Sequence, residues 1–426
     1  MSEKTEPAWL ADGLDHIWLP YVQMKTGARP MAARSTRGVR ITLADGRELI
    51  DGVASWWTAV HGYNHPALID AARRQLETMP HVMLGGLGHE QPYRLAMRLA
   101  EIAPGDLNHV FFTESGSVAV EVAMKIAVQY WRNRNGAAKT KFVFFHGGYH
   151  GDTFATMAVC DPEEGMHAFF GEALAAHIAA ALPQTQSETD RLRALLADRD
   201  DIAAIIVEPL IQGAGGMRMH DEATLRRLRA ICDEAGVLLI FDEIFTGFGR
   251  TGAMFAGARA GIAPDIMTLG KALTGGVAPL AATIASRAVF AAFYDDAPDK
   301  ALMHGPTYTG HALACAVANA SLDLFAGEPR LEQVAALETA LETAFRPLEN
   351  RDAVAAVRIM GAVGAVEMRA PFDVERSRQR FIDRGVFVRP LGRVIYLTPS
   401  YTISAEDLAA LTRAVAAEVD FLSAHP

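Results

Sequence analysis

The sequence predicts an α/β fold, with a large domain around a mostly parallel sheet and a smaller α+β domain built from both ends of the chain. Three observations carry this prediction: apolar runs that alternate with helical patterns, a hairpin pattern near the N-terminus, and a further strand and helix near the C-terminus. A chain of 426 residues is longer than one compact core usually holds. We therefore expect residues 1–60 and 326–426 to form the small domain, and residues 61–325 the large one.

Five apolar runs predict buried strands, because they are nearly continuous and are separated by helical patterns such as residues 118–131 and 222–235. They are HVFFT (His109–Thr113), KFVFF (Lys141–Phe145), IAAIIVEP (Ile202–Pro209), VLLIFDE (Val237–Glu243) and DIMTLG (Asp265–Gly270). The Ala-rich stretch 173–182 predicts a packed helix. In a sheet of this kind ligands bind at the carboxyl ends of the strands, so the residues that follow each run are the candidates for chemistry.

The two ends of the chain follow other patterns. Residues 39–57 alternate apolar and polar side chains around Ala44-Asp45-Gly46, which predicts an antiparallel hairpin. Adjacent side chains of a strand face opposite ways, so one of Trp56 and Trp57 is expected in the core and the other is free to line a site. The last helix is expected to begin after Ser404, its N-cap.

Composition and charge exclude several classes of function. The formal net charge is −10 and the sequence has no basic cluster, which disfavours nucleic acid and anionic membranes as partners. We see no apolar run of membrane-spanning length and no signal-peptide pattern at the N-terminus. The three cysteines are isolated, without the spacing of a disulfide framework or a zinc site. We expect a soluble cytoplasmic enzyme without a bound metal.

Two residues at predicted strand ends suggest the chemistry. Asp242 ends the run LLIFDE, and Lys271 follows DIMTLG among small residues that let a ligand approach the backbone. The plain alternatives are a capping aspartate and a surface lysine. Together, however, they suit pyridoxal phosphate, which needs a lysine amine for a Schiff base and a carboxylate facing its pyridinium nitrogen. Once substrate displaces it, the lysine amine can move the Cα proton.

Two turns add polar groups near these strand ends. TESGSVAVEVAMK (residues 113–125) opens a helix directly after a strand, where backbone N–H groups and the hydroxyls of Ser115 and Ser117 suit a phosphate. HGGYHGDT (residues 146–153) follows the next strand. Its Tyr149 can lie on a cofactor ring, and Asp152 can orient neighbouring polar groups. The two histidines of this turn are interpreted as loop residues, since no third metal ligand has suitable spacing.

The motifs FDEIFTGFGRTG, PDIMTLGKALTGG and HGPTYTGHALACA resemble those of the class III aminotransferases of fold type I, and the similarity runs nearly end to end. The resemblance implies a homodimeric transaminase with shared active sites and pyridoxal phosphate as cofactor. The roles it implies are Lys271 for the Schiff base, Asp242 for the pyridinium nitrogen, Tyr149 for the ring, Gly116 and Ser117 for the phosphate, and Thr307, beside Pro306, for the phosphate of the partner subunit.

A narrower resemblance concerns the substrate. HIWLPYVQM, DGVASWW, HVMLGGLGH and VRPLGRVIYLTPSY are similar to the branch of this class that transfers an amino group from S-adenosylmethionine to 8-amino-7-oxononanoate in biotin biosynthesis. The substrate-lining residues that it implies are Tyr21, Trp56, Trp57, Tyr149, Gly305, Arg389 and Tyr396. Phe245 replaces a glutamine common in the class, and Ala214 stands near the position of a gate glutamate. Both departures disfavour a glutamate/2-oxoglutarate couple.

The chemistry of this substrate pair agrees with the residues. Aromatic walls bury a methylene chain at about 0.8 kcal/mol per CH₂, Arg389 can grip a terminal carboxylate, and a sulfonium favours a π face. One alternative is another class III enzyme that acts on diamines, β-alanine or ω-amino acids, or that uses lysine as donor. The others are a catalytically silent cofactor-binding protein and a nicotinamide oxidoreductase, which lacks support because no GxGxxG turn follows a strand.

Overall fold

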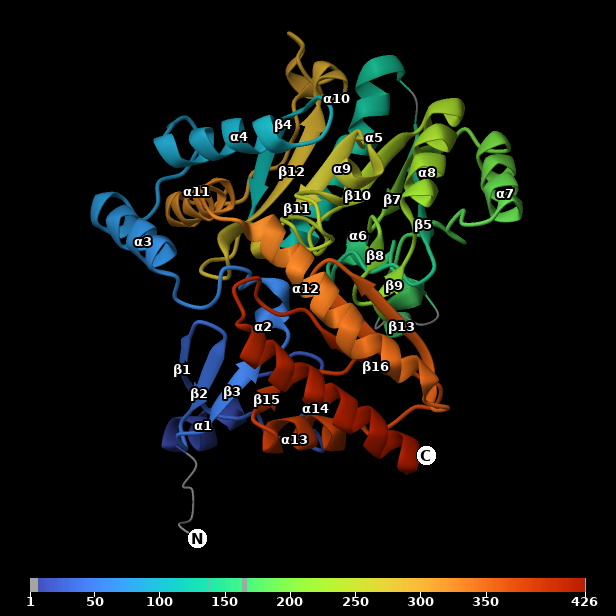
Figure 1. Ribbon diagram of the computed structural model, residues 1–426. Coiled ribbons are helices and arrows are strands. Elements are labelled where there is room, and N and C mark those ends of the chain that lie inside the picture. Colours follow the sequence, from blue (N-terminus) through green and yellow to red (C-terminus); the bar gives the residue numbers. More distant parts are fainter. Residues whose placement is uncertain (1–6, 137, 163–166, 426) are drawn as a thin grey trace.

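The larger part of the molecule is built on a seven-stranded sheet with the strand order β4-β12-β11-β10-β7-β5-β6 (Figure 1). The computed structural model describes residues 7–136, 138–162 and 167–425. The strands of this sheet are β4 (Leu107–Thr113), β5 (Lys141–Phe145), β6 (Ile178–Ala180), β7 (Ile202–Val207), β10 (Leu238–Asp242), β11 (Ile266–Leu269) and β12 (Ala281–Ser286). Neighbouring strands are parallel except at β12, which runs antiparallel to both β4 and β11. The predicted fold class is confirmed.

Helices cover this sheet on both sides. Figure 1 shows α3, α4 and α11 gathered beside β4, and α7 and α8 beside β5 and β7. Their bounds are α3 (Pro66–Thr78), α4 (Glu90–Ile102), α5 (Gly116–Asn135), α7 (Gln186–Ala197), α8 (Glu222–Ala235) and α11 (Ala312–Gly327). Every residue of β7, β10 and β11 is buried, which explains their uninterrupted apolar character. The helix expected over 173–182 is wrong, because this stretch contains the end of a short 3₁₀ turn and then β6.

Both ends of the chain meet in the smaller part, as predicted. The four-stranded sheet β1-β2-β3-β15 joins the hairpin strands β1 (Ala33–Arg37), β2 (Arg40–Leu43) and β3 (Glu48–Asp51) to the C-terminal strand β15 (Val386–Phe387). A three-stranded sheet follows, with β13 (Val354–Met360), β14 (Val363–Met368) and β16 (Val394–Leu397). The helices packed here are α12 (Arg330–Phe345), α13 (Val374–Asp383) and α14 (Ala405–Ala424), the last capped by the Ser404 hydroxyl as expected.

The hairpin strand ends earlier than the sequence pattern suggests. Residues 54–57, labelled α2 in Figure 1, form a left-handed helical turn whose φ angles are 45°, 50°, 53° and 75°. The Trp57 N–H donates to the Val53 carbonyl and the Thr58 N–H to the Ala54 carbonyl, both at 2.9 Å. The expectation that Trp56 and Trp57 lie in a strand is therefore wrong. Left-handed helix costs about 1–2 kcal/mol per non-glycine residue, so other contacts must hold this turn.

No helix in the described part of the chain has the length and apolar character to cross a membrane. The three cysteines are free and buried. Among the described residues, no group of three or more histidine, cysteine or carboxylate side chains is arranged to hold a metal ion.

Candidate active site

Asp242 and Lys271 meet in one pocket at the carboxyl ends of β10 and β11. Asp242 is the last residue of β10, and Lys271 follows β11 after a single glycine. The residues predicted from the sequence that line this pocket are Trp57, Gly116, Ser117, Tyr149, Asp242 and Lys271. The topology explains the meeting, because β10 and β11 are parallel neighbours whose carboxyl ends lie at one edge of the sheet.

Three hydrogen bonds fix the Asp242 carboxylate, which is only 4% exposed. Nδ1 of His150 lies 2.8 Å from Oδ2, while Oδ1 accepts from the Ile244 N–H and the Thr268 hydroxyl, each at 3.2 Å. A histidine that donates from Nδ1 orients the carboxylate. His150 is thus a site residue, and not the simple loop residue that the sequence predicts. Its one signal was its place directly after Tyr149 in the turn that follows β5.

Burial sets the properties of the lysine amine. Lys271 has a φ of 44° and begins a short 3₁₀ turn (Lys271–Thr274), which directs its side chain back into the pocket. Its Nζ lies 4.9 Å from the centroid of the Trp57 ring. Burial lowers the pKa of Lys271, and the nearby carboxylates of Asp242 and Glu208 oppose this shift. A larger neutral fraction makes the amine a better nucleophile and base.

Glu208 is a second buried carboxylate at the pocket wall. Burial raises the pKa of Glu208 to about 7, although the His150 ring opposes the shift. Its two oxygens accept hydrogen bonds from the backbone N–H groups of Tyr149 and Gly213, each at 2.9 Å. Glu208 therefore ties the turn that carries Tyr149 to the turn that begins at Gly213, directly after β8 (Ile211–Gln212).

The first turn of α5 forms another wall of the pocket. Gly116 and Ser117 line it, and the first N–H groups of a helix have no partner within the helix. The Ser115 hydroxyl accepts from the Val118 N–H at 3.3 Å, so it caps the helix. An accepting hydroxyl keeps its own O–H as a donor, so the phosphate role of Ser115 stays a prediction. The Ser117 hydroxyl accepts from the Asp152 N–H at 3.1 Å.

Asp152 joins two tyrosines at the mouth of the pocket. The Tyr149 hydroxyl donates to one carboxylate oxygen at 2.9 Å, and the Tyr21 hydroxyl donates to the other at 2.6 Å. Burial raises the pKa of Tyr21 to about 12, and the bond to Asp152 adds to this shift. Asp152 thus orients neighbouring polar groups as expected, and it brings Tyr21 to Tyr149 from a distant part of the chain.

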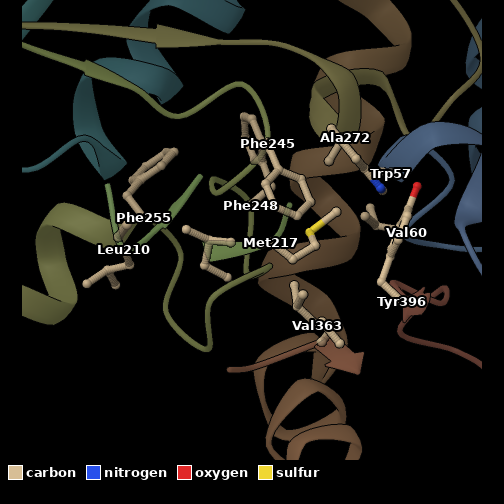
Figure 2. Packing of buried hydrophobic residues seen from close by; sticks show 14 of the residues in the cluster. Trp57, Val60, Leu210, Met217, Phe245, Phe248, Phe255, Ala272, Val363 and Tyr396 are labelled. Atoms are coloured by element: carbon tan, nitrogen blue, oxygen red, sulfur yellow. The ribbon is translucent and has the colours of Figure 1, made fainter. Parts of the chain in front are cut away.

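The two tryptophans of the left-handed turn differ in burial and in their neighbours. Trp57 is 8% exposed and packs on Phe245, with ring centroids 4.2 Å apart, and edge-on to Tyr396 at 6.4 Å. Figure 2 shows these three side chains converging from separate elements. Trp56 is 39% exposed, and the Arg389 guanidinium carbon lies 4.5 Å from its ring centroid. Trp57 is therefore the core residue of the pair as well as a pocket wall, and Trp56 faces solvent beside Arg389.

Arg389 is half-buried, and no carboxylate in the described ranges forms an ion pair with it. Burial, followed by the nearby Arg378, lowers the pKa of this guanidinium. Ala214, which stands near the expected gate position, lines the pocket and supplies no acid. A cation without an anionic partner at this place is suited to a ligand carboxylate.

Gly305, Pro306 and Thr307 do not line the pocket of their own chain. They lie between a 3₁₀ turn (Pro298–Lys300) and α11, and both Gly305 and Thr307 are exposed. A single subunit thus brings together all the predicted cofactor-binding residues except this segment.

The fold and the pocket that brings Asp242 to Lys271 are those of an aminotransferase. The model of the family "Aminotransferase class-III" matches residues 21–418, and the chain belongs to this family of aminotransferases. The adenosylmethionine-8-amino-7-oxononanoate aminotransferase of Corynebacterium glutamicum is 43% identical over 95% of this chain and 97% of that protein. The crystal structure of the enzyme of that name from Methanocaldococcus jannaschii superimposes with a TM-score of 0.91 at 30% identity, covering 97% of this chain and 98% of that one. An amine transaminase from an uncultivated Pseudomonas species, solved in its PLP-bound form, gives a TM-score of 0.87 at 30% identity and covers 95% of this chain and 98% of its own.

Proposed function

We propose that this aminotransferase uses pyridoxal phosphate to move an amino group from S-adenosylmethionine to 8-amino-7-oxononanoate, giving 7,8-diaminononanoate in biotin biosynthesis. One observation carries the proposal: half-buried Arg389, which forms no ion pair with a carboxylate of the described residues, stacks on Trp56, the chain neighbour of the pocket residue Trp57. The names of the relatives support it, since the enzymes from Corynebacterium glutamicum and Mycobacterium leprae, 43% and 42% identical, both carry this activity in their names.

The pocket offers the groups that pyridoxal phosphate requires. An amine, a buried carboxylate, an aromatic side chain and the start of a long helix line the same cavity, through Lys271, Asp242, Tyr149 and the Gly116-Ser117 pair. When bound, the cofactor supplies a carbonyl carbon for amines and a ring that accepts the electron pair of a broken Cα–H bond. Gly116 and Ser117, with Thr307 and Pro306 of the partner subunit, are the residues we assign to its phosphate.

The residues of the chain divide the remaining work. Lys271 takes the substrate's Cα proton on Nζ and returns a proton to the acceptor, for which a lowered pKa is required. Asp242, oriented by the imidazole of His150, keeps a positive charge on the nitrogen that faces it. Tyr149 shields the reacting atoms from water on the side of Asp152.

The substrate region fits a long apolar chain with an anionic end. Trp57 and Tyr21 offer aromatic surface for methylene groups, and buried Tyr396 packs edge-on against Trp57. Arg389, stacked on Trp56, offers a cation for the carboxylate. Gly305 of the partner subunit is assigned to the same region. The exposed face of Trp56 is also open to the sulfonium of the donor.

We further propose a homodimer in the cytoplasm, with the active sites shared between subunits. The exposed position of Thr307, outside its own pocket, supports the sharing. Three free and buried cysteines suit a reducing compartment. We retain residues 1–60 with 326–426 as one domain and 61–325 as the other, because β3 and β15 pair and so join the two ends of the chain in one sheet.

A donor assay tests the proposed function. Holoenzyme is supplied with 8-amino-7-oxononanoate and, in separate reactions, with S-adenosylmethionine, lysine, alanine or glutamate, and the diamine product is measured by mass spectrometry. We expect S-adenosylmethionine to be the best donor, and Lys271→Ala to give no product with any of them. Product with lysine or alanine but not S-adenosylmethionine would instead favour another class III ω-aminotransferase, the alternative raised by the likeness to the amine transaminase.

A further inference from the structure

One carboxylate stands at the start of the left-handed turn that carries both tryptophans. Asp51, the last residue of β3, is 2% exposed. Its Oδ1 accepts from the Val53 N–H at 2.8 Å, and its Oδ2 accepts from the Ser55 N–H at 2.8 Å and from the Tyr63 hydroxyl at 2.5 Å. No cation in the described part of the chain forms an ion pair with it. All three hydrogen bonds described for this carboxylate therefore come from the backbone around the turn and from Tyr63.

These bonds explain how four residues keep an unfavourable backbone conformation. The N–H groups of Val53 and Ser55 reach the same carboxylate only when the chain curls back after β3, which the left-handed turn achieves. Tyr63 holds the carboxylate from the other side. Tyr63 is itself anchored to the hairpin, because its N–H donates to the Gly38 carbonyl at 2.6 Å and its carbonyl accepts from the Gly38 N–H at 3.1 Å.

The conformation of this turn decides where Trp56 lies. If β3 continued as a strand, Trp56 and Trp57 would point to opposite faces of the sheet. In the left-handed turn, the Trp56 ring instead lies 4.5 Å from the Arg389 guanidinium carbon. Trp57 is held independently by Phe245 and Tyr396, whereas Trp56 is exposed and its ring contacts are with Arg389 and, edge-on, Tyr21. Trp56 and the guanidinium that it supports therefore depend more on the turn than Trp57 does.

We propose that Asp51, braced by Tyr63, is a positioning residue for the acceptor: it holds the turn that sets Trp56 against Arg389 and so aims the guanidinium at the substrate's distal carboxylate. Asp51 touches neither substrate nor cofactor in this scheme. The inference rests on the proposed function for the identity of the acceptor, but the state of the turn can be measured without any substrate.

The first test follows the turn itself in the holoenzyme. Hydrogen–deuterium exchange is measured by mass spectrometry for peptides covering residues 52–59 in wild type, Asp51→Asn and Tyr63→Phe. Asparagine turns an NH₂ toward one of the two backbone donors, so we expect exchange to be roughly tenfold faster in Asp51→Asn and less accelerated in Tyr63→Phe. The matched control is Ser377→Ala, which likewise removes one hydroxyl donor to a buried carboxylate, that of Glu418, at 2.8 Å in the small domain. Unchanged exchange over residues 52–59 in both Asp51→Asn and Tyr63→Phe overturns the inference.

The second test asks whether the effect passes through Trp56. We expect Asp51→Asn to raise the KM for 8-amino-7-oxononanoate roughly tenfold while kcat changes less than threefold, and Tyr63→Phe to give a smaller change of the same kind. In a Trp56→Ala background, Asp51→Asn should raise KM no further, because the side chain that it positions is gone. A loss of thermal stability and kcat at unchanged KM, or an equal KM effect in both backgrounds, overturns the inference. Should Asp51→Asn not fold, Tyr63→Phe alone decides both tests.

The two hypotheses fail in different ways. A wild-type enzyme that does not accept 8-amino-7-oxononanoate refutes the proposed function and, with it, the role of Asp51 toward that acceptor. A wild-type enzyme that accepts it, with variants whose KM is unchanged, refutes only the role of Asp51.

Discussion

Asp242 is the residue whose environment is most completely defined. Its carboxylate is buried beside an imidazole and accepts two further hydrogen bonds, an arrangement that fixes its orientation at the end of β10. We expect Asp242→Asn to lose activity by on the order of 10³-fold or more, because an amide cannot hold the pyridinium charge. The visible spectrum of the purified variant reports whether cofactor remains bound, and turnover is measured on the same sample.

A matched variant separates charge from geometry at this position. Thr268→Val removes only one hydrogen bond to the same carboxylate and leaves its charge, so a loss of about tenfold or less is expected. Activity of Asp242→Asn within tenfold of wild type would contradict the role assigned to Asp242.

Arg389 gives the prediction that bears most directly on the substrate. A charge-assisted contact to a carboxylate contributes about 1.5–3 kcal/mol, so Arg389→Ala should raise the KM for 8-amino-7-oxononanoate roughly ten- to a hundredfold. Single-turnover spectroscopy follows each half-reaction separately. Equal damage to both halves would mean that Arg389 serves the donor's carboxylate too.

The control for Arg389 removes a different guanidinium. Exposed Arg369 donates to the Asp352 carbonyl, and Arg369→Ala should leave both half-reactions unchanged. If the keto-acid half of Arg389→Ala is intact, the distal carboxylate is bound elsewhere and the assignment of this substrate loses its main physical support.

Site residues were predictable where a simple rule connects sequence to position. Asp242 and Lys271 directly follow buried apolar runs, and parallel strands bring such positions to one edge. His150 was not predictable in the same way, because its role arises from the meeting of the turn after β5 with the end of β10, two strands away in the sheet. The Ser115 hydroxyl has a local role as well, since it caps α5 by accepting from the Val118 N–H.

At the scale of elements, the left-handed turn at residues 54–57 makes a prediction about stability. Ser55 has φ 50° and ψ 59°, a conformation that glycine adopts freely and β-branched residues resist. The reference is Ser55→Ala, because all three variants then lack the serine hydroxyl. Relative to Ser55→Ala, the free energy of unfolding should be about 1 kcal/mol or more higher in Ser55→Gly and lower by a similar amount in Ser55→Val, with matching shifts of the thermal midpoint. Differential scanning calorimetry provides the measurement. Equal midpoints for the glycine and valine variants would mean that the turn is not left-handed in solution.

The elements that the sequence predicted well are those whose burial leaves a continuous signal. All five apolar runs contain a strand of the central sheet, since strands covered on both faces need apolar residues at every position. β12 was missed, because AATIAS is short and Ala-rich, although it completes the sheet between β4 and β11. The left-handed turn is not predictable from the sequence for another reason. Asp51 and Tyr63 stabilise it through contacts that do not appear in the local pattern of apolar and polar side chains.

At the scale of the whole molecule, the proposed homodimer bears on the exposed apolar side chains. Large apolar side chains are exposed on and near α4 and on the segment before α11; they include Met83, Leu87, Tyr93, Met97, Met303 and Tyr308. A second subunit that packs on these segments would bury such side chains. Thr307 lies in the same exposed segment as Met303 and Tyr308, which is where a residue that serves the partner's phosphate has to be.

Subunit mixing tests this sharing directly. Lys271→Ala and Thr307→Ala are each expected to be inactive, but in a mixed dimer both lesions fall in one site and leave the other intact. Random exchange makes half of the dimers mixed, with one working site in two, so about a quarter of wild-type activity should return. The control mixes Lys271→Ala with Asp242→Asn, whose lesions lie in the pocket of their own chain, so every site stays damaged and no activity should return. If the first mixture also stays inactive after exchange is verified by mass spectrometry, or if a monomer in sedimentation is fully active, Thr307 does not complete the neighbouring site.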